Sequence, residues 1–280
     1  MTDTDVLYPE FSVCMSVYKN DNANDFLAAL RSISIKQTVK PQKIILVVDG
    51  PISEAIDKVI SSFATEFENL QVIRLKENKG NAIARQTAIN EVQTPWFAIM
   101  DSDDIAQSDR FEKQLSFIIS NPSCDAVGGQ IKEFIGTTDN IVGKRAVPLA
   151  DEDVKKYMKS RCPMNFMTVM LRREQVENVG GVVDWYYEED YYLWIRMALA
   201  GCTFANLPDT LVNVRVGKDM YQRRGGWRYF KSERKIQRFM LKNKLIGLPR
   251  YCYNVLGRFV VQVLMTNRMR SFVFQKLFRQ

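Results

Sequence analysis

The sequence predicts an α/β fold in which a mostly parallel central sheet is flanked by helices. Up to Ser120, short and almost continuously apolar runs alternate with segments of helical periodicity. Strands that are buried on both faces of a parallel sheet have this pattern. From about Asp125 the pattern changes to strand-like segments joined by a turn, which predicts a small antiparallel insertion. A basic, helical extension ends the chain.

The first half of the chain predicts strands and helices in alternation. Phe11–Tyr18 is apolar and rich in β-formers, and residues 24–37 carry apolar side chains at helical spacing. Right-handed crossovers would place the helices on both faces of the sheet. By the same reasoning we expect strands at Lys43–Val48, Gln71–Leu75 and Trp96–Asp101, and helices at Ser53–Phe67, Asn81–Glu91 and Asp109–Ser120.

The second half predicts the insertion, the end of the main domain and the extension. The segments AVGGQIKEF and IVGKRAVP, joined by the turn GTTDN, predict two antiparallel strands. A domain over residues 1–216 is then completed by a helix at Asp151–Ser160, a strand at Thr168–Leu171 and a helix at Glu189–Ala200. Residues 217–280 predict an amphipathic helical region, with one helix at Trp227–Leu245 and another from Tyr251 onward, separated by a break at 247–250.

Composition excludes several classes of enzyme. The chain has no histidine, which rules out Ser-His-Asp hydrolases, HExxH zinc enzymes and histidine general bases. The motifs GxGxxG and GxxxxGKS/T are also missing, which argues against dehydrogenases and P-loop enzymes. Five widely spaced cysteines without a CxxC pair fit neither a disulfide framework nor a zinc ribbon, and they favour a reducing compartment. Acid–base chemistry must therefore fall to carboxylates, Lys, Tyr or Cys.

The start of the chain and its apolar segments predict a cytoplasmic protein. The N-terminal MTDTDVLYPEF is acidic and polar, unlike a secretory signal. The longest apolar stretch, Val255–Met265, is about half the roughly 20 residues that a spanning helix needs. We therefore expect neither export nor a transmembrane helix.

Acidic residues follow two of the predicted strands. Asp101, Ser102, Asp103 and Asp104 come directly after the apolar run WFAIM, and Asp49 ends the strand KIILVV. Open α/β sheets bind ligands at the carboxyl ends of their strands. Carboxylate oxygens suit Mg²⁺ or Mn²⁺ and leave positions open for phosphate oxygens. The alternative is a set of ordinary turns and helix caps.

Two further segments contain residues that are suited to ligand binding or catalysis. Residues 78–85, NKGNAIAR, feed a helix whose N-terminal amides and basic side chains suit an anionic or nucleotide ligand, although ordinary helix initiation also fits. In residues 185–194, WYYEEDYYLW, three carboxylates are flanked by aromatic side chains. Aromatic surroundings desolvate a carboxylate, raise its pKa and make it a better general base. The alternative is an acidic first turn of a helix.

Taken in order, these motifs resemble a known family. SVYKND, QTVKPQKIILVVDG, NKGNAIARQTAI, DSDDIAQSDRFEKQ, VGG and YYEEDYYLWIRMALAG, between residue 11 and about residue 227, are similar to motifs of bacterial family-2 glycosyltransferases. That family builds capsule, O-antigen and exopolysaccharide repeat units. The resemblance implies a GT-A fold and an inverting, metal-dependent enzyme that moves a sugar from a UDP-sugar, or another nucleoside-diphosphate sugar, to a hydroxyl of a lipid-linked saccharide acceptor.

The resemblance also implies roles for individual residues. Asp190 matches the general base of the family's ED motif. Asp101 is expected near the donor's ribose and, with Asp103, at a Mn²⁺ or Mg²⁺ ion. Ser16, Tyr18, Asp49 and Arg85 are expected near the nucleobase, Arg223 and Arg224 over the diphosphate, and Trp185, Tyr187 and Glu189 at the acceptor.

The chain departs from the family pattern at two places. Phe166 stands where many relatives have a histidine, so the role of that histidine is missing or falls to Asn165 or Thr168. The QxxRW motif of processive members is represented only by the variant QRRGGW at residues 222–227. A solvated basic loop is the alternative for this segment.

The extension is strongly basic. Residues 217–280 hold 16 of the 39 Lys and Arg residues and 2 of the 32 Asp and Glu residues, a net charge of +14 against −7 for the rest. A stripe of five basic residues at helical spacing, called the basic stripe below, comprises Arg228, Lys231, Lys235, Arg238 and Lys242. A basic amphipathic helix pair can lie on an anionic membrane surface, here the inner face of the cytoplasmic membrane. Packing on the catalytic domain is the alternative.

Three other functions compete with a glycosyltransferase. A sugar nucleotidyltransferase would share the sheet but should carry a Gly-rich loop after the first strand, where this chain has SVYKND. A non-catalytic carbohydrate-binding protein would need no metal cluster. A nucleic-acid partner is not expected, because no recognised RNA-binding or DNA-binding module occurs.

Overall fold

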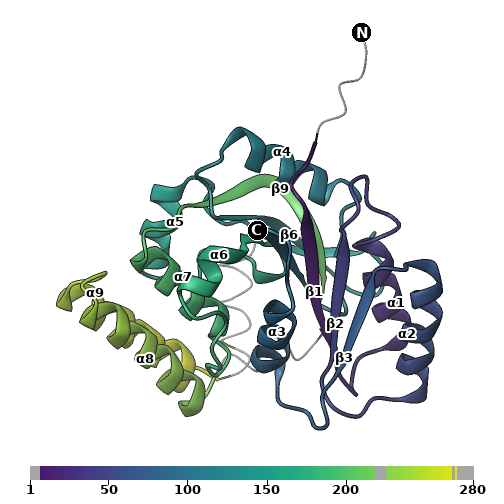
Figure 1. The fold of residues 1–280 in the computed structure, drawn as a ribbon. Coiled ribbons are helices and arrows are strands. Elements are labelled where there is room, and N and C mark those ends of the chain that lie inside the picture. Colours follow the sequence, from purple (N-terminus) through teal and green to yellow (C-terminus); the bar gives the residue numbers. More distant parts are fainter. Residues whose placement is uncertain (1–6, 218–224, 267–268, 270–280) are drawn as a thin grey trace.

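The computed structural model describes residues 7–217, 225–266 and 269, and Figure 1 shows their arrangement. The strands are β1 Phe11–Val17, β2 Lys43–Val48, β3 Leu70–Arg74, β4 Trp96–Met100, β5 Ile105–Ala106, β6 Ala126–Phe134, β7 Ile141–Arg145, β8 Met170–Arg172 and β9 Phe204–Arg215. The helices are α1 Ala23–Ser32, α2 Glu54–Glu66, α3 Asn81–Asn90, α4 Arg110–Ser120, α5 Asp151–Met158, α6 Arg173–Asn178, α7 Glu189–Leu199, α8 Trp227–Lys242 and α9 Leu248–Phe259. Short helical turns occupy Phe166–Thr168 (η1) and Val260–Leu264 (η3).

The strands of the described residues form one sheet in the order β3-β2-β1-β4-β8-β6-β9-β5, and β7 pairs with β6. The first four strands of this order are parallel, as predicted. Beyond β4 the sheet is mixed, because β8 runs antiparallel to both β4 and β6 while β9 runs parallel to β6. The predicted antiparallel insertion is the β6–β7 pair.

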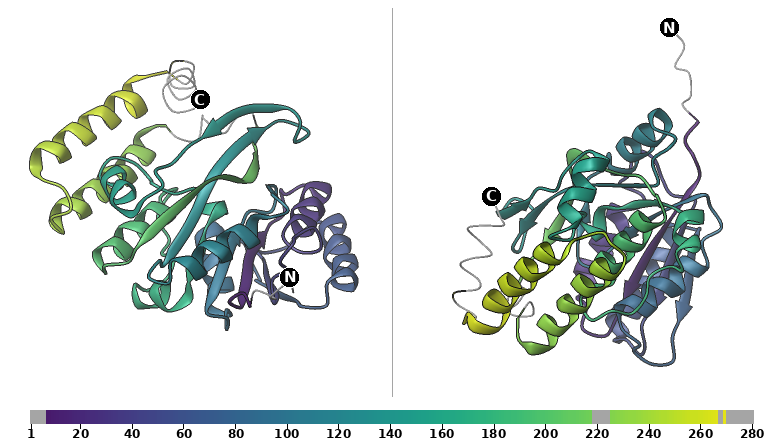
Figure 2. Two further views of the ribbon diagram at one scale, coloured as in Figure 1. Left: turned by 90° about the horizontal axis from the view of Figure 1, so that it is seen from above. Right: turned by 90° about the vertical axis from the view of Figure 1, so that its left-hand side faces the viewer.

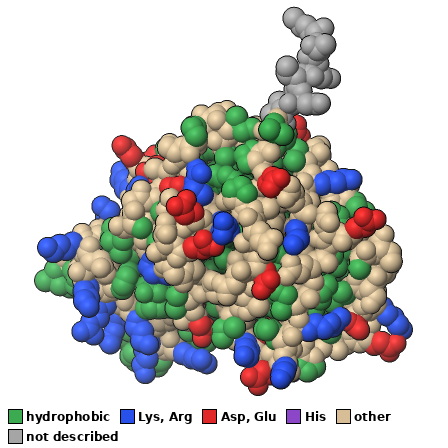
Figure 3. Space-filling model, in the orientation of Figure 1, with side chains coloured by type: hydrophobic (Ala, Val, Ile, Leu, Met, Phe, Trp, Pro, Cys, Tyr) green, Lys and Arg blue, Asp and Glu red, His purple; other side chains and the backbone are tan. Residues whose placement is uncertain are grey.

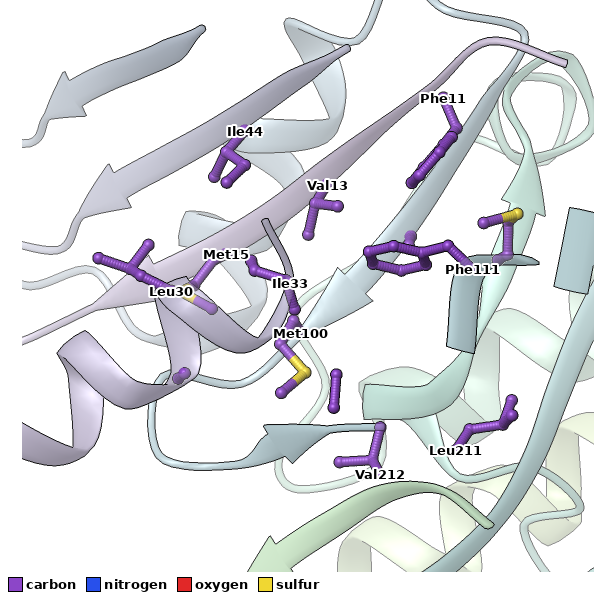
Figure 4. Packing of buried hydrophobic residues seen from close by; sticks show 14 of the residues in the cluster. Phe11, Val13, Met15, Leu30, Ile33, Ile44, Met100, Phe111, Leu211 and Val212 are labelled. Carbon is purple, nitrogen blue, oxygen red and sulfur yellow. The ribbon is translucent and has the colours of Figure 1, made fainter. Parts of the chain in front are cut away.

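Helices cover both faces of the parallel strands. Side chains alternate between the faces of a strand, so Val13 and Met15 of β1 join one core cluster with α1, α2 and α4, while Cys14 joins another with α3, α5 and α7. Figure 4 shows the first cluster, in which Met15 lies beside Leu30 of α1. The alternation therefore fixes the sheet between two helical layers and leaves the carboxyl ends of its strands for ligands.

Strand β9 was not predicted from the sequence. Pro208 and Asp209 interrupt its apolar pattern and read as a turn. In the structure they lie where the register with β6 shifts, between Gly129 and Ile131, so the strand continues past them.

Other boundaries also differ from the predictions. Helix α1 ends at Ser32, five residues before the predicted end, and helix α6 was not predicted. The turn η1 replaces the start of the strand predicted at Thr168. Helix α9 begins at Leu248 rather than Tyr251, because Pro249 fits the first turn of a helix, where no backbone N–H is needed.

The C-terminal hairpin, defined as α8, α9 and η3, packs against the catalytic body. Figure 2 shows α8 and α9 side by side along one flank of the molecule. Ile236 and Met240 of α8 are buried in the core cluster that contains α7. None of the helices in the described part of the chain combines the length and apolarity required to cross a bilayer.

Candidate active site

The acidic turn at residues 101–104 follows β4 at the carboxyl edge of the sheet, as predicted. Arg215, which ends β9, holds this turn. Its backbone N–H donates to Asp104 Oδ1 (2.8 Å), and its guanidinium donates to the carbonyl of Asp103 (3.1 Å) and pairs with Asp25 (2.9 Å). Burial raises the pKa of Asp104 well above its usual value. Asp104 therefore supports the turn, which the sequence did not reveal.

Asp21 is a site residue that the sequence analysis missed. One of its oxygens, Oδ2, accepts hydrogen bonds from the backbone N–H of Tyr18 (3.0 Å) and from the Ser102 hydroxyl (2.8 Å). Ser102 lies between the two aspartates expected at the metal, so Asp21 ties the loop after β1 to the acidic turn. Its place inside the SVYKND motif was the available signal.

Negative charge accumulates at this edge. Asp103 is open to solvent on one side, yet desolvation by the surrounding protein, followed by the charges of Asp101 and Asp21, raises its pKa to about 6. Burial likewise raises the pKa of Asp21, and the charge of Asp101 adds to the effect. A bound cation would relieve the repulsion between these carboxylates.

Asp49 shapes the turn that begins α3. Its two oxygens accept from the backbone N–H groups of Lys79 (2.7 Å) and Gly80 (3.0 Å). The next residue, Gly50, has a φ of +85°, and a Cβ there would lie 2.5 Å from the backbone nitrogen of Asn78. Glycine is therefore required where the two loops touch.

The other residues expected near the nucleobase lie at the same edge. The hydroxyl of Ser16 donates to Asn81 Oδ1 at the start of α3 (3.1 Å), and the Tyr18 side chain is exposed. Ser16 and Asp49 thus contact the N-terminus of α3, although contact of these residues and Tyr18 with a nucleobase remains a prediction.

Arg85 joins the acidic turn to the acidic start of α7. Its guanidinium donates to Asp101 Oδ1 (2.5 Å) and to Glu189 Oε1 (3.1 Å) and lies 4.7 Å from the centre of the Phe166 ring. Phe166 in turn packs edge-on against Trp194. Phe166, which replaces the expected histidine, therefore contacts the Arg85 guanidinium through the face of its ring.

Asp190 is held at both carboxylate oxygens. Oδ1 accepts from the backbone N–H of Tyr191 (2.6 Å), and Oδ2 accepts from the thiol of Cys162 (3.3 Å). Burial raises the pKa of both preceding carboxylates, Glu188 and Glu189. The role of Asp190 as the base remains a prediction.

The aromatic residues of the loop before α7 differ in exposure. Trp185 packs on Tyr192, with ring centres 4.4 Å apart, and is half-buried. Tyr187 is 51% exposed and has a φ of 56°, which is uncommon for a bulky residue and is typical of strained functional loops. Tyr187 is therefore the better placed of the two for stacking on a sugar.

The C-terminal hairpin contacts this loop. The Tyr229 hydroxyl donates to Glu188 Oε1 (2.5 Å), and the Ser232 hydroxyl donates to the carbonyl of Tyr186 (2.8 Å). The guanidinium of Arg228 lies 4.0 Å from the centre of the Tyr186 ring. The hairpin therefore helps to hold the segment that leads to Asp190.

Two expected donor residues, Arg223 and Arg224, lie outside the described residues. Among the residues that are described, no group of three or more Cys, Asp or Glu side chains is arranged to hold a metal ion.

Comparison with protein families gives a match to the model described as glycosyl transferase family 2, over residues 12–180. Two full-length relatives are informative. The amylovoran biosynthesis glycosyltransferase AmsE of Erwinia amylovora is 34% identical over 95% of this chain and 98% of its own length. The UDP-Gal:alpha-D-GlcNAc-diphosphoundecaprenol beta-1,3-galactosyltransferase of Escherichia coli is 31% identical over 97% of this chain and 98% of its own.

Solved structures share the fold at low sequence identity. S. aureus TarS 1–349 in complex with UDP-GlcNAc has a TM-score of 0.65 at 18% identity, covering 90% of this chain and 72% of that one. The mannosyltransferase PcManGT from Pyrobaculum calidifontis, solved with GDP-Man and Mn²⁺, has a TM-score of 0.62 at 15% identity, covering 95% and 72%. The predicted GT-A architecture is confirmed by these likenesses.

Proposed function

The chain belongs to glycosyl transferase family 2, and from this premise we propose that it transfers a sugar from a UDP-sugar to a hydroxyl of a lipid-linked saccharide in surface polysaccharide synthesis, inverting the anomeric carbon. The observation that carries this proposal is the double contact of Arg85 with Asp101 and Glu189. It joins the acidic turn on the donor side to the neighbour of Asp190 on the acceptor side.

The donor and acceptor classes are supported by the relatives. The Escherichia coli relative is named for a UDP-Gal donor and a GlcNAc-diphosphoundecaprenol acceptor, and it matches this chain almost end to end. In this chain, Ser16 and Asp49 contact the N-terminus of α3, where backbone N–H groups favour anions, and Tyr18 and Arg85 remain our further candidates for the donor. Arg223 and Arg224 remain our candidates for closing over the diphosphate.

Asp101 and Asp103 fit a divalent cation. Their carboxylate oxygens are the ligands that Mg²⁺ and Mn²⁺ prefer, and one or two carboxylates plus substrate phosphates are the usual set for Mg²⁺. Desolvation, followed by repulsion from Asp101 and Asp21, raises the pKa of Asp103 to about 6, and a cation would relieve that repulsion. When bound, the ion would offset the charge that develops on the departing diphosphate.

Asp190 is the proposed general base. Its carboxylate accepts the proton of the acceptor hydroxyl while that oxygen bonds to the anomeric carbon and the bond from this carbon to the diphosphate oxygen breaks. Trp185 and Tyr187 offer aromatic faces to the acceptor. Glu189 remains an acceptor candidate through its exposed edge, although its Oε1 already accepts from Arg85.

The C-terminal hairpin is the proposed membrane-binding surface, at the inner face of the cytoplasmic membrane. All five residues of the basic stripe are exposed on α8, and Figure 3 shows basic side chains gathered over the hairpin at the lower left. On α9 and η3 an apolar stripe is exposed. It consists of Tyr253 (74% exposed), Leu256 (65%), Val260 and Leu264. Basic and apolar stripes on one helical pair suit an anionic bilayer surface.

A transfer assay tests the proposed chemistry. UDP-Glc, UDP-Gal, UDP-GlcNAc and UDP-GalNAc are each incubated with a synthetic lipid-diphosphate saccharide, and UDP and product are measured. We expect one donor to give acceptor-dependent UDP release. Asp190→Asn should keep the donor affinity while kcat falls by roughly 10² or more.

A matched control is available in the same loop. Asp184 is exposed, so Asp184→Asn should leave kcat unchanged. Full kcat in Asp190→Asn would remove Asp190 as the base, and loss of donor binding with the fold intact would make it a binding residue. Formation of a UDP-sugar and pyrophosphate from UTP and a sugar 1-phosphate, in place of sugar transfer, would point to a nucleotidyltransferase.

A further inference from the structure

Cys162 is the one cysteine of the described residues whose thiol contacts a residue of the proposed site. Its Sγ lies 3.3 Å from Asp190 Oδ2. We infer that Cys162 is a positioning residue that orients the Asp190 carboxylate. This inference rests on the proposed role of Asp190 as the general base.

The geometry fixes the carboxylate plane. The backbone N–H of Tyr191 holds Oδ1 from within α7, and the thiol approaches Oδ2 from the loop between α5 and η1. The backbone of Cys162 is itself anchored, because Arg145 of β7 donates to its carbonyl (2.9 Å). Each oxygen has a second lone pair to offer an acceptor hydroxyl, so the two contacts set a direction without filling the site.

The Cys162 thiol stays protonated near neutral pH and therefore remains a hydrogen-bond donor. Burial, with the charge of Asp190 second, keeps the pKa of Cys162 well above its usual value, so the group does not ionise near neutrality. The alternative acceptor for the thiol, the Met164 carbonyl, is farther away at 3.5 Å. The proton therefore points preferentially to Asp190.

A thiol suits a base better than a hydroxyl would. Hydrogen bonds donated to an ionised carboxylate stabilise the charged form and so lower its affinity for a proton. Because S–H is a weak donor, the thiol can orient Asp190 while leaving it more basic than a serine would.

Other charges near Asp190 come from several elements. Arg85 of α3 is close enough to be affected by the Asp190 charge, Arg145 of β7 lies behind Cys162, and Glu188 and Glu189 precede Asp190 in the chain. Tyr229, Glu233 and Arg258 of the hairpin lie next to Glu188. Substituting Cys162 leaves all these groups in place, so a change in pH dependence reports the thiol.

The test compares the pH dependence of kcat in wild type, Cys162→Ser and Cys162→Ala at saturating substrates. Below the acid limb Asp190 is protonated and kcat falls. Removing the donor destabilises the carboxylate, so Cys162→Ala should shift the acid limb to higher pH by roughly half to one unit. The stronger hydroxyl donor of Cys162→Ser should shift it to lower pH, with a reduced plateau. Donor KM should change little in either variant.

Cys202→Ala provides the control, because the Cys202 thiol contacts Gln175 instead of the site. Its acid limb should match that of wild type. The inference is overturned if folded Cys162→Ser, which is close to isosteric, has the wild-type acid limb. If Asp190→Asn retained full kcat, the proposed base itself would be wrong, so the two failures are distinguishable.

Discussion

At the scale of single residues, Asp103 combines a functional position with an unfavourable charge. Its pKa, raised from 3.8 to about 6, means that the folded protein binds the proton more tightly than the unfolded chain does. Stability therefore falls as pH rises from about 4 to about 6, and that cost persists at neutral pH unless a cation is bound.

The functional position of Asp103 and its unfavourable charge together give a prediction for Asp103→Asn. Without added metal at pH 7.5, the variant should unfold at a higher temperature than wild type, because a repelled charge has been removed. Donor binding that depends on Mn²⁺ should weaken at least tenfold, because a ligand of the cation has been removed. Differential scanning fluorimetry and titration of UDP with and without Mn²⁺ measure the two effects.

Asp139→Asn is the control, since Asp139 is an exposed residue of the β6–β7 turn. It should change neither quantity. Donor binding that is equally strong in EDTA and in Mn²⁺ would contradict the metal assignment, whatever the behaviour of the variant.

Sequence reasoning identified site residues where the residue type itself carries the chemistry. Asp49, Arg85, Asp101 and Asp190 were proposed from their motifs, and in the structure Arg85 pairs with Asp101 and with Glu189, the neighbour of Asp190, while their roles remain predictions. Asp21 and Cys162 were missed as site residues because their importance comes from a partner far along the chain, Ser102 and Asp190 respectively. Such pairings become visible only when the fold brings the segments together.

At the scale of secondary structure, β9 shows why part of the fold escaped prediction. Period and composition identified the buried parallel strands, where the pattern is continuous. In β9 the pair Pro208–Asp209 reads as a turn, and only the register shift against β6 accommodates it. Arg215 ends β9 and holds the acidic turn, so missing β9 in the sequence also meant missing this residue of the candidate site.

Helix α8 contacts the loop before α7 through the Tyr229 hydroxyl, which leads to a prediction for Tyr229→Phe. Tyr229 donates to the buried carboxylate of Glu188, two residues before Asp190. Without this bond, the free energy of unfolding should fall by about 1–2 kcal/mol. We also expect kcat to fall several-fold while donor KM is kept, because the loop before Asp190 loosens.

Chemical denaturation and steady-state kinetics with a short-chain acceptor measure both effects. Tyr8→Phe, which removes a more exposed contact with Ser116 (3.3 Å), is the matched control. A variant with normal kcat and only reduced stability would limit α8 to a structural role.

At the scale of the whole molecule, charge divides the chain into a body of −7 and an extension of +14. The hairpin packs through one face onto α7, as the packing alternative expects, while membrane binding by its other face remains a prediction. The packed face is buried, while the basic stripe on α8 and the apolar stripe on α9 and η3 remain exposed. An anionic surface would attract the extension and repel the body, which would orient the enzyme.

The last prediction separates attraction from insertion by co-sedimentation with neutral and anionic vesicles from about 50 to 500 mM salt. Over this range the Debye length falls from over 10 Å to about 4 Å, so attraction between exposed charges weakens strongly. Wild type should bind anionic vesicles at low salt and keep part of this binding at high salt. Changing the basic stripe to Gln should remove the salt-sensitive part of the binding, because each basic residue near the surface contributes about 1 kcal/mol. Changing Tyr253, Leu256 and Leu264 to Ser should leave low-salt binding but remove the salt-resistant part.

Five exposed lysines of the body, changed to Gln with the same loss of charge, should have no effect, and this control comprises Lys36, Lys40, Lys58, Lys76 and Lys156. If that control lost binding as fully as the stripe variant, net charge alone would explain the attraction, and if wild type ignored anionic vesicles, the exposed stripes would have to serve another partner.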